Sequence, residues 1–111
     1  MTVQTEAHLL RIFIDEGSKR DHIPLYQWIV KKAQEQGIAG ATVFRAMAGY
    51  GSHRVMHSSS ILDISSNLPV VIEIVDQEEA LVNLVRALSE VIKEGVATLE
   101  KVRIYKFGQT L

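Results

Sequence analysis

Two kinds of apolar pattern alternate along this chain of 111 residues, and their order limits the possible folds more than any other property. Four short runs are rich in β-branched and aromatic residues, which is typical of strands. Two longer segments carry apolar residues at intervals of three and four, which is the spacing of an amphipathic helix. Strands are expected at 9–15, 41–48, 68–75 and 102–107, and helices at about 24–36 and from 76 to near 95.

The order strand, helix, strand, strand, helix, strand is that of the split βαβ, or ferredoxin-like, α+β fold. In this fold a four-stranded antiparallel sheet carries both helices on one face. Pro24 and Gly37 suit the two ends of the first helix, and Asp76 with Glu79 has the spacing of a capping box at the start of the second. We expect a single ferredoxin-like domain over residues 1–111, with a folded core at about 8–107 and a long loop at about 51–67.

The predicted strands carry apolar side chains on both faces, although two helices can cover only one face. A contiguous exposed apolar patch usually marks an interface, and a closed cyclic assembly is the common way to cover it. We therefore expect self-association, with the charged residues of this face paired; the alternative is that these charges only keep an open sheet face solvated. The open face is expected to hold Leu9, Phe13, Val71 and Val75 with the charged residues Arg11, Arg45 and Glu73.

Composition excludes several classes of function. The chain has 12 Lys and Arg against 13 Asp and Glu, so it offers no strongly basic surface, and no nucleic-acid partner is expected. The absence of Cys excludes disulfides, thiolate zinc sites and thiol chemistry, and it suits a reducing compartment. Residues 1–8 lack the basic and apolar regions of a signal peptide, and no apolar run is long enough to span a membrane. A cytoplasmic protein is expected.

Three stretches resemble the PII-like signalling superfamily, and in particular its branch known only as a conserved domain of unknown function. They are FRAMAGYGSHR at 44–54, LPVVIEIVDQEE at 68–79 and EGVATLEKVRIY at 94–105, and the resemblance spans residues 9–107. It implies a homotrimer with small-molecule sites in the clefts between subunits, where the common ligands are adenine nucleotides. It also implies that the loop after the second strand signals to a transporter, a channel or an enzyme.

The resemblance implies two groups of ligand-binding residues. Residues at the base of the loop are small, so that backbone N–H groups can approach a phosphate; from the residues alone, the two glycines there also fit a plain strand-ending bulge. The segment that closes over the ligand departs from the signal-transducing PII proteins, since it reads GVATLEK, and AMP or ADP is therefore expected rather than ATP. The candidate nucleotide-binding residues are Gly49, Tyr50, Gly51, Ser52, Lys93, Gly95, Thr98 and Arg103.

Two alternatives remain open at this stage. A metal-responsive trimer resembling the divalent-cation-tolerance proteins would rely on His22, His53 and His57. A small enzyme with its site between subunits is the other alternative, but no nucleophile, base and acid stand in a recognisable arrangement. We assign no catalytic residue, no metal ligand and no required cofactor, and we expect a regulator rather than an enzyme.

Overall fold

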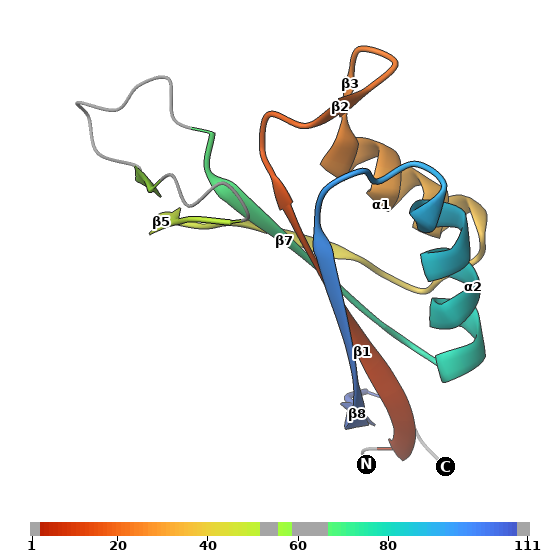
Figure 1. Cartoon of the computed structure of the whole chain (residues 1–111). Coiled ribbons are helices and arrows are strands. Elements are labelled where there is room, and N and C mark those ends of the chain that lie inside the picture. Colours follow the sequence, from red (N-terminus) through yellow and green to blue (C-terminus); the bar gives the residue numbers. More distant parts are fainter. Residues whose placement is uncertain (1–2, 52–55, 59–66, 109–111) are drawn as a thin grey trace.

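The computed structural model describes residues 3–51, 56–58 and 67–108 and is built on a four-stranded main sheet with two helices on the same side (Figure 1). The sheet has the strand order β4-β7-β1-β8, and every neighbouring pair is antiparallel. This is the predicted ferredoxin-like α+β architecture. The sheet strands are β1 (Val3–Asp15), β4 (Thr42–Arg45), β7 (Pro69–Asp76) and β8 (Val96–Lys106), and the helices are α1 (Leu25–Glu35) and α2 (Glu78–Ser89).

The hydrophobic core lies between the sheet and the two helices. Side chains of β7 alternate strictly, so that every second residue from Val70 to Ile74 is buried and those between are half-buried. Because partners across two strands share a face, the buried residues of β7 lie opposite the buried residues of β1. The core is formed chiefly by Leu10, Ile12, Ile14, Val70, Ile72 and Ile74 of the sheet with Ile29, Leu81 and Leu84 of the helices.

Helix α1 has the predicted ends. Pro24 stands immediately before its first residue, and Gly37 takes the left-handed conformation with φ of 80° just after it. The N–H of Gly37 donates to the carbonyl of Gln34, and the N–H of Ile38 donates to the carbonyl of Ala33. These two bonds form a Schellman motif, which satisfies carbonyls that a helix end would otherwise leave unpaired.

Helix α2 and the strand after it differ from the prediction. The N-cap of α2 is Gln77 and makes no side-chain capping bond, so the predicted capping box is wrong. Asp76 instead ends β7 and accepts a hydrogen bond from the backbone N–H of Gln77 at 2.7 Å. The helix stops at Ser89 rather than near residue 95, and β8 begins at Val96 rather than at 102.

Exposure explains why the early part of β8 escaped prediction. This strand lies at the edge of the sheet, and all its residues from Val96 to Lys101 are exposed. An exposed edge strand needs no regular apolar alternation, so the sequence there lacks the usual signal. Strand β1 likewise begins at Val3, earlier than the predicted residue 9, because it pairs with β8 from Val3 to Phe13.

Short paired segments lie outside the main sheet. Strand β2 (Lys19–Arg20) pairs with β3 (Ile23–Pro24) in the connection to α1. Strand β5 (Ala48–Gly49) pairs with β6 (His57–Ser58), so the predicted loop at about 51–67 includes one arm of a hairpin that projects away from the helices (Figure 1). The rest of that loop, at 52–55 and 59–66, lies outside the described residues. No helix in the described ranges is both long enough and apolar enough to cross a membrane.

Candidate functional site

The open face of the sheet carries a row of apolar side chains that crosses all four strands. The strand register places Phe44 of β4 opposite Val71 of β7, Val71 opposite Phe13 of β1, and Phe13 opposite Val96 of β8. Phe13, Phe44 and Val96 are 40%, 50% and 63% exposed. We call these four residues the apolar row. An exposed row of this kind is what the sequence predicted for the uncovered face.

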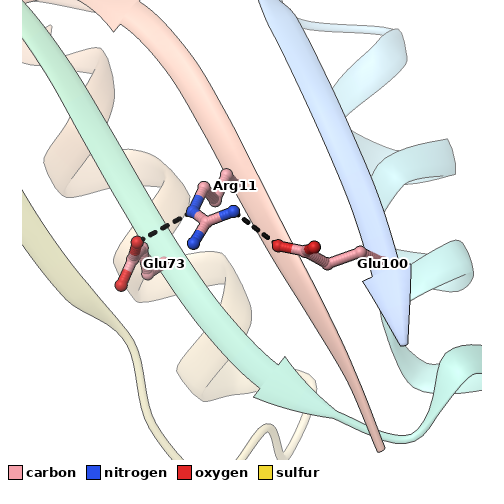
Figure 2. Close-up of polar contacts among 3 residues, drawn as sticks. All are labelled: Arg11, Glu73 and Glu100. Carbon is pink, nitrogen blue, oxygen red and sulfur yellow. Dashed lines mark hydrogen bonds and ion pairs between the residues drawn. The ribbon is translucent and has the colours of Figure 1, made fainter. Parts of the chain in front are cut away.

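A charged cluster lies next to the apolar row. Arg11 of β1 stands opposite Glu73 of β7, and its Nε donates to a carboxylate oxygen of Glu73 at 3.0 Å. Its Nη1 donates to a carboxylate oxygen of Glu100 on β8 at 2.5 Å, so Arg11 bridges three strands (Figure 2). The hydrogen bond to Glu73 is the largest cause that raises the pKa of Arg11; desolvation opposes it, and the hydrogen bond to Glu100 adds a smaller increase. The predicted pairing of Arg11 with Glu73 is confirmed.

Arg45 does not join this cluster. It lies opposite Val70, whose side chain is buried on the helix-covered face, so the expectation that Arg45 pairs on the open face is wrong. The reason is the side-chain period of two along a strand, which puts Thr42 and Phe44 on the open face and Arg45 on the other. Its Nε pairs with Glu16 at 2.6 Å instead.

The base of the loop brings three of the candidate ligand-binding residues close together. Gly49 belongs to β5, and a Cβ added there would lie 3.0 Å from Cγ of Pro69. A Cβ on Gly51 would meet no described atom within 4 Å, and neither glycine has a positive φ. Tyr50, between them, is exposed, and Ser52 lies outside the described residues. Packing against Pro69 therefore accounts for Gly49, whereas none of the residues that the structure describes demands glycine at position 51.

The second group of candidates stands at the start of β8. A Cβ on Gly95 would lie 2.9 Å from the backbone oxygen of Phe13, and its φ is 157°. Glycine is thus required here by the close approach of two backbones. Lys93 is exposed in the turn before it, and Thr98 lies in β8, opposite Arg11 on the open face. Thr98 was expected in the connection before the last strand, and it lies inside that strand.

One chain does not bring all these residues together. The loop base extends from β4 and Thr98 lies on β8, which are opposite edges of the sheet, separated by three strand spacings of about 4.8 Å or roughly 14 Å. Arg103 stands opposite Glu6, five residues farther along β8 than Thr98, at roughly 3.3 Å per residue or about 16 Å. Because that separation is odd, the side chains of Thr98 and Arg103 point to opposite faces.

Sequence reasoning missed two residues near Arg103. Lys101 lies on the same face of β8 as Arg103, and His8 lies opposite Lys101 on β1. All three line one shallow hollow. The spacing Lys-x-Arg in the sequence could have indicated that Lys101 and Arg103 share a face, but only if one strand is known to include both residues.

The histidines proposed for metal do not form a cluster in the described part of the chain. His22 is exposed, with φ of 68°, in the turn between β2 and β3. His53 and the side chain of His57 lie outside the described residues. Within the described ranges no three residues among His, Asp and Glu are grouped so that they could hold a metal ion.

Comparison with known proteins finds relatives over nearly the whole chain. The family model DUF190, described as "Uncharacterized ACR", matches residues 7–104. A UPF0166 protein of Aquifex aeolicus (strain VF5) is 41% identical over 98 residues, which are 86% of this chain and 90% of the relative. A UPF0166 protein of Methanocaldococcus jannaschii is 39% identical over 106 residues, which are 95% of this chain and 96% of the relative.

Solved structures share the fold at low sequence identity. CPII, a nitrogen regulatory PII-like protein from Thiomonas intermedia K12 bound to ADP, AMP and bicarbonate, matches with a TM-score of 0.70 and 16% identity, over 92% of this chain and 91% of its own. A candidate PII-like signalling protein from Thermus thermophilus matches with a TM-score of 0.67 and 19% identity, over 91% of each chain. These likenesses establish a PII-like fold.

Proposed function

The chain belongs to the DUF190 family and has the fold of PII-like signalling proteins, and from this premise we propose that it is a homotrimeric regulator that senses an adenine nucleotide. In this proposal the protein acts in the cytoplasm and is not an enzyme. The nucleotide binds between subunits, and the loop that includes β5 and β6 passes the signal to a transporter, a channel or an enzyme.

The apolar row is the observation that carries the proposal. Phe13, Phe44 and Val96 are substantially exposed on a face that no element of the described chain covers. Burying them between copies of the same chain removes apolar area from water, at about 25 cal/mol per Å². A sheet face that meets another copy of itself around a rotation axis closes into a ring, and the family resemblance favours a ring of three.

The candidate residues suit a nucleotide better than a smaller ligand. Backbone N–H groups at the loop base, the ammonium of Lys93 and the hydroxyl of Thr98 are donors that phosphate oxygens accept. The strands next to the two groups, β4 and β8, are opposite edges of the sheet and lie roughly 14 Å apart in one chain, so a ligand that contacts both groups must be long or must lie between two subunits. Gly95 keeps the second group in place by allowing β8 to start close to β1.

The likeness to CPII supports the choice of ligand, since that protein binds ADP and AMP. The segment from Gly95 to Lys101 lacks the residues with which the signal-transducing PII proteins close over a triphosphate, and we therefore propose AMP or ADP rather than ATP. For Arg103 to contact the same phosphate as Thr98, the two residues must come from different subunits, because within one chain they face opposite sides of β8.

The loop is suited to contact a partner. Met47, Tyr50 and Met56 are exposed around the hairpin of β5 and β6. Methionine and tyrosine side chains make adaptable apolar contacts and are enriched at protein interfaces. A membrane transporter or channel with an apolar recess is the partner class we propose.

Light scattering and calorimetry test this function. The wild type is expected to have the mass of three chains and to bind ADP or AMP more tightly than ATP. Lys93→Gln should weaken nucleotide binding about tenfold, through the loss of one charged hydrogen bond, without changing the mass. Lys31→Gln, which removes an exposed cation from α1, is the matched control and should bind as the wild type does. If the wild type binds none of AMP, ADP and ATP at millimolar concentration, the proposal that it senses an adenine nucleotide is wrong.

A further inference from the structure

Arg103 has neighbours of its own at the far end of β8. The register places Arg103 opposite Glu6 and Lys101 opposite His8. Residues two apart on a strand share a face, so Lys101 and Arg103 project to the same side. With Ala7 and Val102, these four residues line a hollow of about 300 Å³.

The charge in this hollow favours an anion. Two cationic side chains, Lys101 and Arg103, line the hollow together with one carboxylate, that of Glu6, while the nearby carboxylate of Glu78 is paired with His8. Within the described ranges neither cation forms an ion pair or a hydrogen bond, so both are available to a ligand. His8 is held by its Nε2, which lies 3.4 Å from a carboxylate oxygen of Glu78 in the first turn of α2.

The two cations stand close enough together to reach one oxyanion. Cα atoms two residues apart on a strand are separated by about 6.6 Å, and both side chains are long and flexible. Arginine supplies a forked planar donor, and lysine supplies a compact charge that can swing to the same oxyanion.

We propose that Lys101 and Arg103, beside His8, form a binding site for a phosphate group, separate from the nucleotide site at the start of β8. Within one chain, Thr98 and Arg103 lie about 16 Å apart along one strand and face opposite sides of the sheet, so Arg103 could join the proposed nucleotide site only from a neighbouring subunit. The site does not depend on nucleotide binding elsewhere. Its ligand is either free phosphate or the phosphate of a larger metabolite.

Calorimetric titration with inorganic phosphate at constant ionic strength tests the site. The wild type binds phosphate, and the double variant Lys101→Gln with Arg103→Gln binds it at least about tenfold more weakly, because two charged hydrogen bonds are lost. Lys31→Gln removes an exposed cation from α1 and is the matched control, with unchanged phosphate affinity. Absence of binding to the wild type, or unchanged binding to the double variant, overturns the proposal.

Titration with ADP separates this site from the proposed nucleotide site. If the sites are distinct, Arg103→Gln leaves the affinity for ADP unchanged, whereas Lys93→Gln lowers it. If Arg103→Gln and Lys93→Gln lower the affinity for ADP equally, the two belong to one site and the separate phosphate site is rejected. If ADP binds no variant while phosphate still binds through Lys101 and Arg103, the nucleotide function fails and the phosphate site stands.

Discussion

The two faces of the sheet are made by the same strands and are completed in different ways. On the helix-covered face, Leu10, Ile12 and Ile72 are at most 1% exposed, and no polar or charged side chain among the described residues is buried with them. On the open face the apolar row stays exposed and the cluster of Arg11 interrupts it. The covered face needs only this chain, whereas in our proposal the open face is completed by other copies.

The comparison shows that the strand register decides which residues form the core and which form the open face. Side chains alternate with a period of two, so a shift of one residue would exchange the core with the open face. In our proposal both faces can be apolar because one is closed within the chain and the other between chains. Substitutions at neighbouring positions of β1 and β7 therefore report on different events, folding in one case and assembly in the other.

The largest effect is expected from a charge placed on the open face. Phe13→Asp puts a carboxylate in the middle of the apolar row, where assembly would bury it without a partner. An uncompensated buried charge costs about 3–5 kcal/mol, and each subunit of the ring contributes that cost. The variant should remain folded and become monomeric, which light scattering and circular dichroism measure together.

The matched control for Phe13→Asp is Ile23→Asp. Ile23 is 43% exposed, close to the exposure of Phe13, but it lies on β3 outside the main sheet. This variant should keep the mass of the wild type. A Phe13→Asp protein that keeps the wild-type mass would show that the open face is not the association surface.

A cavity in the covered face should have the next largest effect. Ile72 is completely buried, and Ile72→Ala is expected to lower the free energy of unfolding by about 2–5 kcal/mol. Val71→Ala changes the adjacent residue on the half-buried open face and should cost less. Urea unfolding at several protein concentrations makes the comparison sharper, because only the decrease in unfolding free energy caused by Val71→Ala should depend on protein concentration. Equal decreases for both variants, independent of concentration, would contradict the distinction between the faces.

The start of β8 next to β1 depends on Gly95. A methyl group there would press on the backbone oxygen of Phe13 at 2.9 Å, so Gly95→Ala should cost about 1–3 kcal/mol of stability. Gly40→Ala is the control, since a Cβ at Gly40 meets nothing within 4 Å, and its effect should stay within about 0.5 kcal/mol. Thermal unfolding distinguishes the two. A Gly95→Ala protein as stable as the control would mean that β8 can move away from β1 without loss.

The central strands and both helices could be predicted from the sequence because burial imposes a regular pattern on them. Ile12 and Ile14 of β1 and Ile72 and Ile74 of β7 alternate with less buried neighbours, and this alternation identifies both the strands and the face. The edge strand β8 shows no such pattern in its first half, where every residue is exposed. Its start was therefore placed at 102, and the connection before it was made too long.

The misplaced start of β8 also explains why the candidate site was predicted only in part from the sequence. With β8 starting at 102, Thr98 and Arg103 belonged to different elements, and nothing prevented them from meeting at one phosphate. With β8 starting at Val96, they stand on one strand at an odd separation, which sends them to opposite faces. Lys101 becomes the neighbour of Arg103 only in that register. Which strand residues share a face depends on pairing, and pairing is a long-range property.

The smallest effect is expected from the charged cluster of the open face. Arg11→Met keeps much of the side-chain bulk and leaves the carboxylates of Glu73 and Glu100 without their shared cation. Because its partners raise the pKa of Arg11, its charge would be lost only as the pH rises to strongly alkaline values, so the pairing cannot be removed by mild base and needs a substitution. Assembly of Arg11→Met should be weaker than that of the wild type, and added salt should restore part of it by screening the two carboxylates.

A second substitution determines whether charge or hydrogen bonding matters in this cluster. One arginine and two glutamates give it a net charge of −1, Arg11→Met alone gives −2, and Arg11→Met with Glu100→Gln returns it to −1 without the hydrogen bonds. If repulsion governs the loss, the double variant should assemble nearly as the wild type does in sedimentation measurements, and Glu100→Gln alone should assemble more tightly. If the double variant is as weak as Arg11→Met, the directed bonds that join three strands are what the open face requires, because the same net charge then gives a different assembly.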